Sequence, residues 1–186
     1  MKILNTKIRD LKIIKPKIFK DKRGYFFESY NSNSYKKITK NNRFIQDDHS
    51  FSKKNVLRGI HFQIKKPQNQ LLYLVEGKIF LCFVDLRPKS KTFKKVYTTT
   101  LDSEKHHQIF QPAGVGSGYY VLSIRSHLLY KVSELYHKTN ESAIIWDDKD
   151  LNIKWPCKRP LLSINDQNNL NLSDINLTKY KDLMKL

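Results

Sequence analysis

The residues with the clearest potential for chemistry lie in the stretch Leu57-Arg58-Gly59-Ile60-His61-Phe62-Gln63. Histidine gains or loses a proton near neutral pH, so His61 is a candidate acid or base. Arg58 is a candidate anchor for phosphate, because a guanidinium can donate two parallel hydrogen bonds to an anion. A lone histidine in a strand can equally be a packing or surface residue, and the rest of the chain decides between these interpretations.

The elements that would position these two side chains are predicted to be short β-strands. Residues 71–75 and 79–86 are rich in apolar, β-branched and aromatic side chains, and the turn at Glu76-Gly77 predicts that they pair as a hairpin. Further strand patterns cover residues 96–101, 107–111, 119–124 and 128–136. Short strands separated by turns indicate an antiparallel sandwich or barrel.

A glycine-rich stretch at residues 112–118 predicts a tight turn where backbones crowd. It is not expected to be a phosphate-binding loop, because no helix pattern follows it and the Gly-Lys-Ser/Thr ending is missing. Helices are expected only at two places. Residues 33–39 suit a short helix, and residues 173–186 suit a C-terminal helix, because apolar side chains recur there at helical spacing after a Ser-Asp start.

The length and composition of the chain fit one folded domain over residues 1–186. Hydrophobic residues make up 39% of the chain, which argues against a disordered protein. No apolar run approaches the roughly 20 residues of a membrane helix, and the N-terminus lacks the apolar core of a signal peptide. Cys82 and Cys157 lack metal-ligand spacing and cannot be assumed to pair, so a cytoplasmic location is expected.

The net charge of +18 raises the question of a nucleic-acid partner. The basic residues are spread along the whole chain, and only 7 of the 35 are arginine, the residue that specific nucleic-acid readers favour. The composition therefore indicates a small anionic ligand, with neither nucleic acid nor membrane as a partner.

Several motifs occur in a fixed order along the chain, and together they are far more specific than any one of them. They occupy residues 21–28, 44–50, 55–63, 84–87, 129–131, 145–148 and 153–156. This set closely resembles the dTDP-4-dehydrorhamnose 3,5-epimerase family of cupin-fold nucleotide-sugar epimerases, over roughly residues 10–167. The resemblance implies an all-β fold, a cupin or jelly-roll antiparallel β-barrel with short helices. It also implies a homodimer that uses no metal and no cofactor.

The resemblance implies a catalytic set of three residues for epimerising a nucleotide-activated 4-keto sugar. The 4-keto group makes the neighbouring C–H protons acidic, so a base can remove one and an acid can return one from the other face. His61 matches the base, Tyr130 matches the acid, and Asp166 matches the carboxylate that orients the histidine. The alternatives are that Tyr130 only fills the barrel and that Asp166 is an ordinary solvated side chain.

Other positions match residues that the family uses to bind the nucleotide, the diphosphate or the sugar. They are Arg23, Glu28, Gln46, Asp47, Arg58, Tyr136 and Glu141. The chain departs from the family pattern at four positions that should also touch the ligand. They are Asp48 where Asn is usual, Gln70 where Lys is usual, Ser117 where His is usual, and Asn165 where Lys is frequent.

These departures lead to a specific expectation about the substrate. Ser117 would free space, and Gln70 and Asn165 would replace point charges with groups that both donate and accept hydrogen bonds. We therefore expect an isomerase that inverts C3, C5 or both on a GDP-4-keto-heptose for capsule synthesis. One alternative is the usual dTDP-4-dehydro-6-deoxyglucose 3,5-epimerase of the dTDP-rhamnose pathway, and another is a binding protein without catalysis.

A metal-dependent cupin enzyme is disfavoured by the same stretch of sequence. His61 has no second histidine two residues further on, and Ser117 removes another potential ligand. His106 and His107 are adjacent, so in a strand they would face opposite sides.

Overall fold

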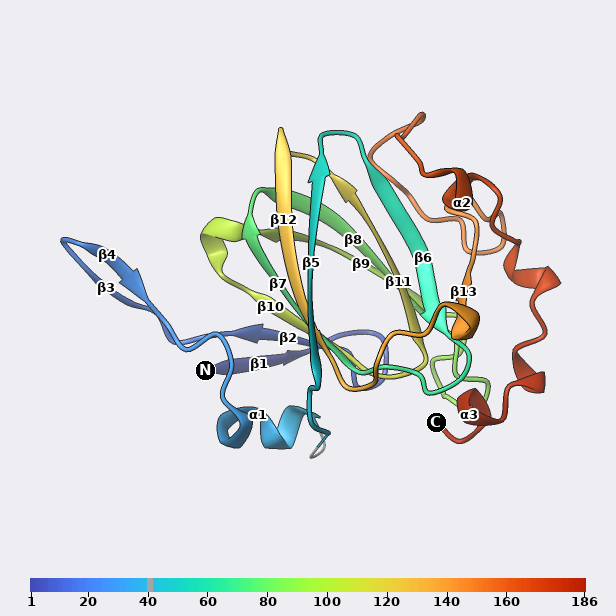
Figure 1. Ribbon diagram of the computed structural model, residues 1–186, viewed down its shortest axis with the longest axis horizontal. Coiled ribbons are helices and arrows are strands. Elements are labelled where there is room, and N and C mark those ends of the chain that lie inside the picture. Colours follow the sequence, from blue (N-terminus) through green and yellow to red (C-terminus); the bar gives the residue numbers. More distant parts are fainter. Residues whose placement is uncertain (40–41) are drawn as a thin grey trace.

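Two antiparallel β-sheets face each other in the computed structural model, which describes residues 1–39 and 42–186 (Figure 1). The first sheet has the strand order β1 (Lys2–Asn5), β2 (Lys12–Lys15), β10 (Gln108–Gln111), β7 (Gln70–Glu76), β12 (Arg125–Val132) and β5 (Gln46–Lys53). The second has the order β13 (Glu141–Ala143), β6 (Leu57–Gln63), β11 (Val115–Val121), β8 (Lys78–Asp85) and β9 (Val96–Asp102). The expected all-β cupin or jelly-roll fold is confirmed.

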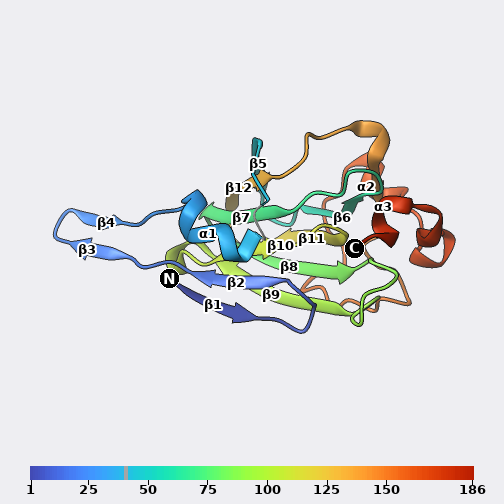
Figure 2. The ribbon, with the colours of Figure 1, turned by 90° about the horizontal axis from the view of Figure 1, so that it is seen from below.

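A third, two-stranded sheet forms an arm that extends from the body of the protein (Figures 1 and 2). It consists of β3 (Phe19–Asp21) and β4 (Gly24–Phe26), which pair antiparallel. Its aromatic side chains are turned to solvent, with Phe26 71% exposed and Tyr25 56% exposed. The Tyr25 ring lies 4.2 Å from the His106 ring, but more than half of each aromatic side chain on the arm stays exposed. Aromatic residues of this size are normally covered, so the arm presents an apolar surface.

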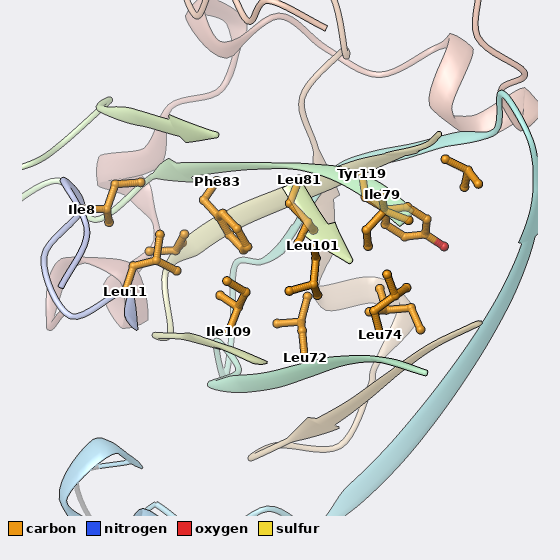
Figure 3. Close-up of a cluster of buried hydrophobic side chains, with 13 residues drawn as sticks. Ile8, Leu11, Leu72, Leu74, Ile79, Leu81, Phe83, Leu101, Ile109 and Tyr119 are labelled. Carbon is orange, nitrogen blue, oxygen red and sulfur yellow. The ribbon is translucent and has the colours of Figure 1, made fainter. Parts of the chain in front are cut away.

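The main core fills the space between the two large sheets, and Figure 3 shows its side chains meeting from both sides. Leu72 and Leu74 come from the first sheet, and Leu81 and Phe83 come from the second, each no more than 3% exposed. The intervening residues of β8 face the other way and pack under the C-terminal segment. Because β8 is covered on both faces, its sequence is a continuous apolar run without polar alternation.

The hairpin expected between residues 71–75 and 79–86 is wrong. Both segments are strands, but β7 pairs with β10 and β12, whereas β8 pairs with β9 and β11. The single connecting residue, Gly77, has a φ of +97° and carries the chain from one sheet to the other. A Cβ at this position would lie 2.2 Å from the carbonyl oxygen of Arg125, so the corner needs glycine.

The glycine-rich stretch 112–118 is a turn only in its first part. Strand β11 begins at Val115, so Gly116 and Gly118 lie inside a strand. Gly118 faces Gly59 of β6 so closely that a Cβ on Gly59 would lie 2.5 Å from the Gly118 Cα. The glycines therefore allow two backbones to approach, as the expected crowding suggested, but they do so within a sheet.

The remaining elements are short helices. Helix α1 (Ser32–Thr39) confirms the expected first helix, and its Tyr35 and Ile38 pack on the outer face of the first sheet against Phe110. The expected C-terminal helix is present but is only one turn, α3 (Lys181–Met184). Before it, the chain forms separate 3-10 turns at Leu172–Asp174 and Leu177–Lys179, and each places a leucine in the core. One-turn α2 (Ile164–Gln167) and two further 3-10 turns, Ser103–Lys105 and Lys138–Asn140, complete the described elements. None of the helices within the described ranges combines the length and apolar character needed to cross a membrane.

Candidate active site

A cavity of about 430 Å³ opens between the two large sheets, and the core residues Leu72 and Leu81 line part of it. The second sheet contributes His61 and Ser117 to its wall, and the first sheet contributes Asp48 and Tyr130. These positions follow from strand alternation, since each side chain points to the inner face of its sheet. The cavity therefore places a histidine and a tyrosine on opposing walls.

His61 is held by a carboxylate from a distant part of the chain. The Nε2 atom of His61 lies 2.7 Å from Oδ1 of Asp166, whose side chain is 5% exposed. Asp166 is fixed in α2 by Ser163, which caps the helix by accepting a hydrogen bond from the Asp166 backbone N–H at 3.0 Å. The Ser163 hydroxyl also donates to Asp166 Oδ2 at 2.9 Å.

These contacts determine the charge state of Asp166. Burial alone would raise the pKa of the Asp166 carboxyl, but hydrogen bonds from His61, Ser163 and the Gly59 backbone outweigh burial and hold that pKa below its usual value. The carboxylate is therefore ionised at neutral pH. An ionised partner accepts a hydrogen bond from Nε2–H and so fixes the orientation of the imidazole ring.

Tyr130 is the titratable group on the opposite wall. Burial, with the nearby Asp48 carboxylate, raises the pKa of the Tyr130 hydroxyl to about 12, and Arg58 opposes this shift. The phenol is therefore protonated at neutral pH. A protonated hydroxyl facing a histidine across a cavity is suited to deliver a proton.

Most of the other predicted ligand contacts line the same cavity. They are Gln46, Asp48, Arg58, Gln70, Ser117, Tyr136 and Glu141. Two pairs among them are already ordered, since Gln46 Nε2 donates to Asp48 Oδ1 at 2.8 Å and the Tyr136 hydroxyl donates to Glu141 Oε2 at 3.0 Å. Arg58 is the one Lys or Arg among the described residues that line it.

Four predicted contacts do not line this cavity, namely Asp47, Asn165, Arg23 and Glu28. Asp47 lies on the outer face of the first sheet, because consecutive strand residues alternate, and it forms an ion pair with Lys131 at 2.9 Å. Asn165 adjoins Asp166 in α2 and is exposed. Neither Asp47 nor Asn165 is brought to the cavity in the way the sequence led us to expect.

Arg23 on the arm and Glu28 just after it lie apart from the cavity of their own chain. Arg23 pairs with Asp21 at 2.6 Å on the exposed arm, and Glu28 accepts a hydrogen bond from Asn31 Nδ2 at 2.9 Å. Figure 1 shows the arm extending away from the two large sheets.

Gln63 and Tyr119 are among the cavity residues that the sequence does not predict. Gln63 follows His61 on the same face of β6 and is 7% exposed. Its Oε1 accepts from the His137 backbone N–H at 3.4 Å, and its Nε2 has no partner among residues 1–39 and 42–186. Tyr119 lines the wall near Tyr130. Strand alternation would have found Gln63, because it lies two residues beyond His61.

Among the residues that the structure describes, no three His, Cys, Asp or Glu side chains are grouped in a way that could hold a metal ion.

Known proteins resemble this chain in sequence and in fold. Residues 5–174 match a family model described as dTDP-4-dehydrorhamnose 3,5-epimerase. A protein of that name from Shigella flexneri is 40% identical over 170 residues, which are 90% of this chain and 94% of the relative. A dTDP-4-dehydrorhamnose 3-epimerase from Streptomyces niveus is 34% identical, covering 87% of this chain and 79% of the relative.

A solved structure has the same fold. It is a dTDP-6-deoxy-D-glucose-3,5-epimerase from Legionella pneumophila in complex with dTDP-4-keto-L-rhamnose. It superposes with a TM-score of 0.91 at 37% identity, and the match covers 95% of each chain.

Proposed function

This chain belongs to the dTDP-4-dehydrorhamnose 3,5-epimerase family and is thus an isomerase, and we propose that it inverts C3 and C5 of a dTDP-linked 4-keto-6-deoxyhexose. One observation carries this proposal. The His61–Asp166 pair and Tyr130 face the same cavity from opposing sheets. Inversion at a carbon requires a base on one face and an acid on the other, and this arrangement provides both.

The proposed reaction proceeds through an enolate. His61 removes the proton from C3 or C5, and the electron pair of the broken C–H bond moves toward the 4-keto oxygen. Tyr130 then donates its hydroxyl proton to the opposite face of the same carbon. The tyrosinate regains a proton from solvent, and the imidazolium releases the one it took. Asp166 holds Nε2 of His61, which leaves Nδ1 as the nitrogen available to the substrate.

Arg58 is the lining cation available to the charge that develops on the keto oxygen. The family's usual lysine and histidine are replaced by Gln70 and Ser117. Gln70 donates to Gln68 Oε1 at 3.3 Å, so its amide is already engaged within the wall. Positive charge near an enolate lowers the barrier, and in this cavity Arg58 is suited to provide it.

The comparisons favour dTDP-linked sugars over the GDP-4-keto-heptose that the sequence departures suggested. The relatives described above carry dTDP sugars in their names, and the Legionella pneumophila structure holds dTDP-4-keto-L-rhamnose. No finding supports a guanine nucleotide or a heptose. We therefore adopt the dTDP-6-deoxyhexose alternative as the substrate.

We also propose that the active form is a homodimer in which each arm reaches the cavity of the other protomer. Arg23 and Glu28 match ligand-binding positions but do not line the cavity of their own chain. Exposed Phe19, Tyr25 and Phe26 give the arm an apolar surface that a second copy would bury. In this proposal residues 1–186 act as one domain, and the partner's arm completes the site.

Deuterium exchange tests the proposed function directly. The protein is incubated in D₂O with dTDP-4-keto-6-deoxyglucose, and label at C3 and C5 is followed by NMR. We expect incorporation at both carbons with conversion to the inverted sugar. Binding without exchange would contradict the proposal and favour a non-catalytic protein. Faster turnover of a GDP-4-keto-heptose than of the dTDP sugar would contradict the proposed substrate and support the one expected from the sequence departures.

A further inference from the structure

A chain of hydrogen bonds runs from Arg58 into the wall of the cavity. Arg58 Nε donates to Ser52 Oγ at 3.0 Å, and Ser52 Oγ lies 3.0 Å from the Tyr119 hydroxyl. That hydroxyl is also 3.1 Å from Ser50 Oγ, which reaches the carbonyl oxygen of Leu128 at 3.5 Å. The chain thus links β6, β5, β11 and β12 behind one side of the cavity.

The direction of these bonds follows from Arg58. A guanidinium nitrogen can only donate, so Ser52 Oγ accepts from it and can use its own hydrogen toward Tyr119. Tyr119 can then donate to Ser50, and Ser50 to the Leu128 carbonyl oxygen. Each of the three hydroxyls then donates one hydrogen bond and accepts one. Only one set of bond directions satisfies all three.

The two interior members of this chain are deeply buried, whereas Arg58 is exposed. Ser52 is 2% exposed and Tyr119 is 8% exposed. Figure 3 shows the Tyr119 ring in the apolar cluster, with its hydroxyl oxygen on the side away from Phe83. An exposed arginine loses much rotamer freedom when it is fixed, so a rigid anchor decides where its charge lies. A second bond, from Arg58 Nη2 to the Phe51 carbonyl oxygen at 3.1 Å, adds to this anchor.

We propose that Ser52 and Tyr119 are positioning residues that hold the Arg58 guanidinium at the cavity wall for the epimerisation. The inference rests on the proposed function. Its chemical reason is that Arg58 is the one Lys or Arg among the described lining residues. Its charge lies close enough to Tyr130 to oppose the rise of that hydroxyl's pKa. A fixed cation acts on charge that develops during the reaction, so losing the anchor should lower kcat more than it raises KM.

The protein contains a closely matched control position for the test variant Ser52→Ala. Ser126 lies directly opposite Ser52 in the β5–β12 register and is 1% exposed. Its hydroxyl has no hydrogen-bond partner within the described ranges. Ser126→Ala therefore removes an equally buried serine hydroxyl but leaves the hydrogen bond from Arg58 to Ser52 in place.

Tyr119→Phe and Tyr120→Phe form a second matched pair. Tyr120 is the next residue in β11, is 7% exposed and donates to Asn55 Oδ1 at 2.8 Å. Each variant removes one hydrogen-bonded phenol hydroxyl from a residue that is no more than 8% exposed, but only the Tyr119 hydroxyl belongs to the hydrogen-bond network that leads to Arg58. This pair keeps the test available if Ser52→Ala folds poorly.

The experiment measures kcat and KM for epimerisation in all four variants, with Tm as a check on folding. We expect Ser52→Ala and Tyr119→Phe to lower kcat by roughly 10- to 100-fold with little change in KM, and both controls to behave as the wild type. Equal kinetics in test and control variants would overturn the inference. An effect confined to KM would also overturn it, because Arg58 would then serve binding alone.

A measurement without substrate separates this inference from the proposed function. The ¹⁵Nε–H signal of Arg58, assigned by its loss in Arg58→Lys, reports whether the guanidinium is held. We expect slow solvent exchange of this hydrogen in the wild type and in Ser126→Ala, and fast exchange in Ser52→Ala. Unchanged exchange in Ser52→Ala would refute the anchor even if the protein is an epimerase. A protected signal in a protein that epimerises nothing would refute the function and leave the anchor intact.

Discussion

Nε2 of His61 lies 2.7 Å from Oδ1 of Asp166, although the two residues are 105 positions apart in the chain. His61 belongs to the second sheet, and Asp166 belongs to a one-turn helix on the C-terminal segment. The chain just before that helix runs along the edge of β6, where the Leu57 backbone N–H donates to the Leu161 carbonyl oxygen at 3.0 Å, and this brings the carboxylate to the histidine. The proposed base thus depends on a part of the chain that contributes no strand to either large sheet.

Replacing His61 with Asn should abolish deuterium exchange at both carbons while the fold is retained. The amide cannot accept the substrate proton, and loss of a positioned base lowers rates by about 10²–10⁴-fold. NMR in D₂O measures the exchange, and circular dichroism checks the fold. His127→Asn is the control, because His127 contacts His49 on the outer face of the first sheet. Exchange at the wild-type rate in His61→Asn would exclude the assignment.

Tyr130→Phe should separate proton removal from inversion. The variant keeps the ring and its packing but lacks the proton that Tyr130 would deliver. We expect deuterium exchange to survive in part and formation of the inverted sugar to fail. Both quantities come from the same NMR time course. Full epimerisation by Tyr130→Phe would assign the acid to another group.

Asp166→Asn should change how stability depends on pH. The folded pKa of Asp166 is below its usual value of 3.8, so the ionised carboxylate contributes stability above about pH 3.8, which is lost as the pH falls through the lower folded pKa. We expect the variant to be about 1–3 kcal/mol less stable at pH 7, and the difference to shrink below pH 4. Urea unfolding at a series of pH values gives the comparison. A constant difference across this range would contradict the sign of the shift.

Mixing two inactive variants should restore activity if the arm serves the partner's cavity. Arg23→Ala protomers keep His61 but lack an arm contact, whereas His61→Asn protomers keep the arm but lack the base. In a mixed dimer, one cavity combines an intact His61 with an intact Arg23. We expect the mixture to exceed the sum of the separate activities after subunit exchange. Activity equal to that sum would place Arg23 outside the partner's site.

The location of the candidate site could be predicted from the sequence, because the motifs that contain its residues occur in a fixed order along the chain. His61, Tyr130 and Asp166 come from three separate elements, and no periodicity in the sequence would have joined them. The three side chains meet at one site because distant parts of the chain pack together. Only the family resemblance predicted that grouping. The roles of these residues remain predictions that the experiments above address.

Two of the predictions made from the sequence are wrong for simple physical reasons. Gln46, Asp47 and Asp48 cannot all face one cavity, because strand residues alternate, and the ion pair of Asp47 with Lys131 lies on the other face. The pair Glu76-Gly77 is typical of a hairpin turn, yet a single glycine also suits a corner between two sheets. Local sequence does not distinguish these cases, because the choice depends on which distant strands pair with β7 and β8.

The close approach of Gly59 and Gly118 limits how this protein can be diversified in the laboratory. Any side chain at Gly59 would collide with the backbone of β11, and a Cβ at Gly118 would lie 2.9 Å from the Arg58 carbonyl oxygen. A mutant library should therefore keep both glycines fixed and randomise wall positions such as Gln70 and Ser117. Variants selected from such a library for new sugars would retain the backbone that carries His61 while exploring different pocket shapes.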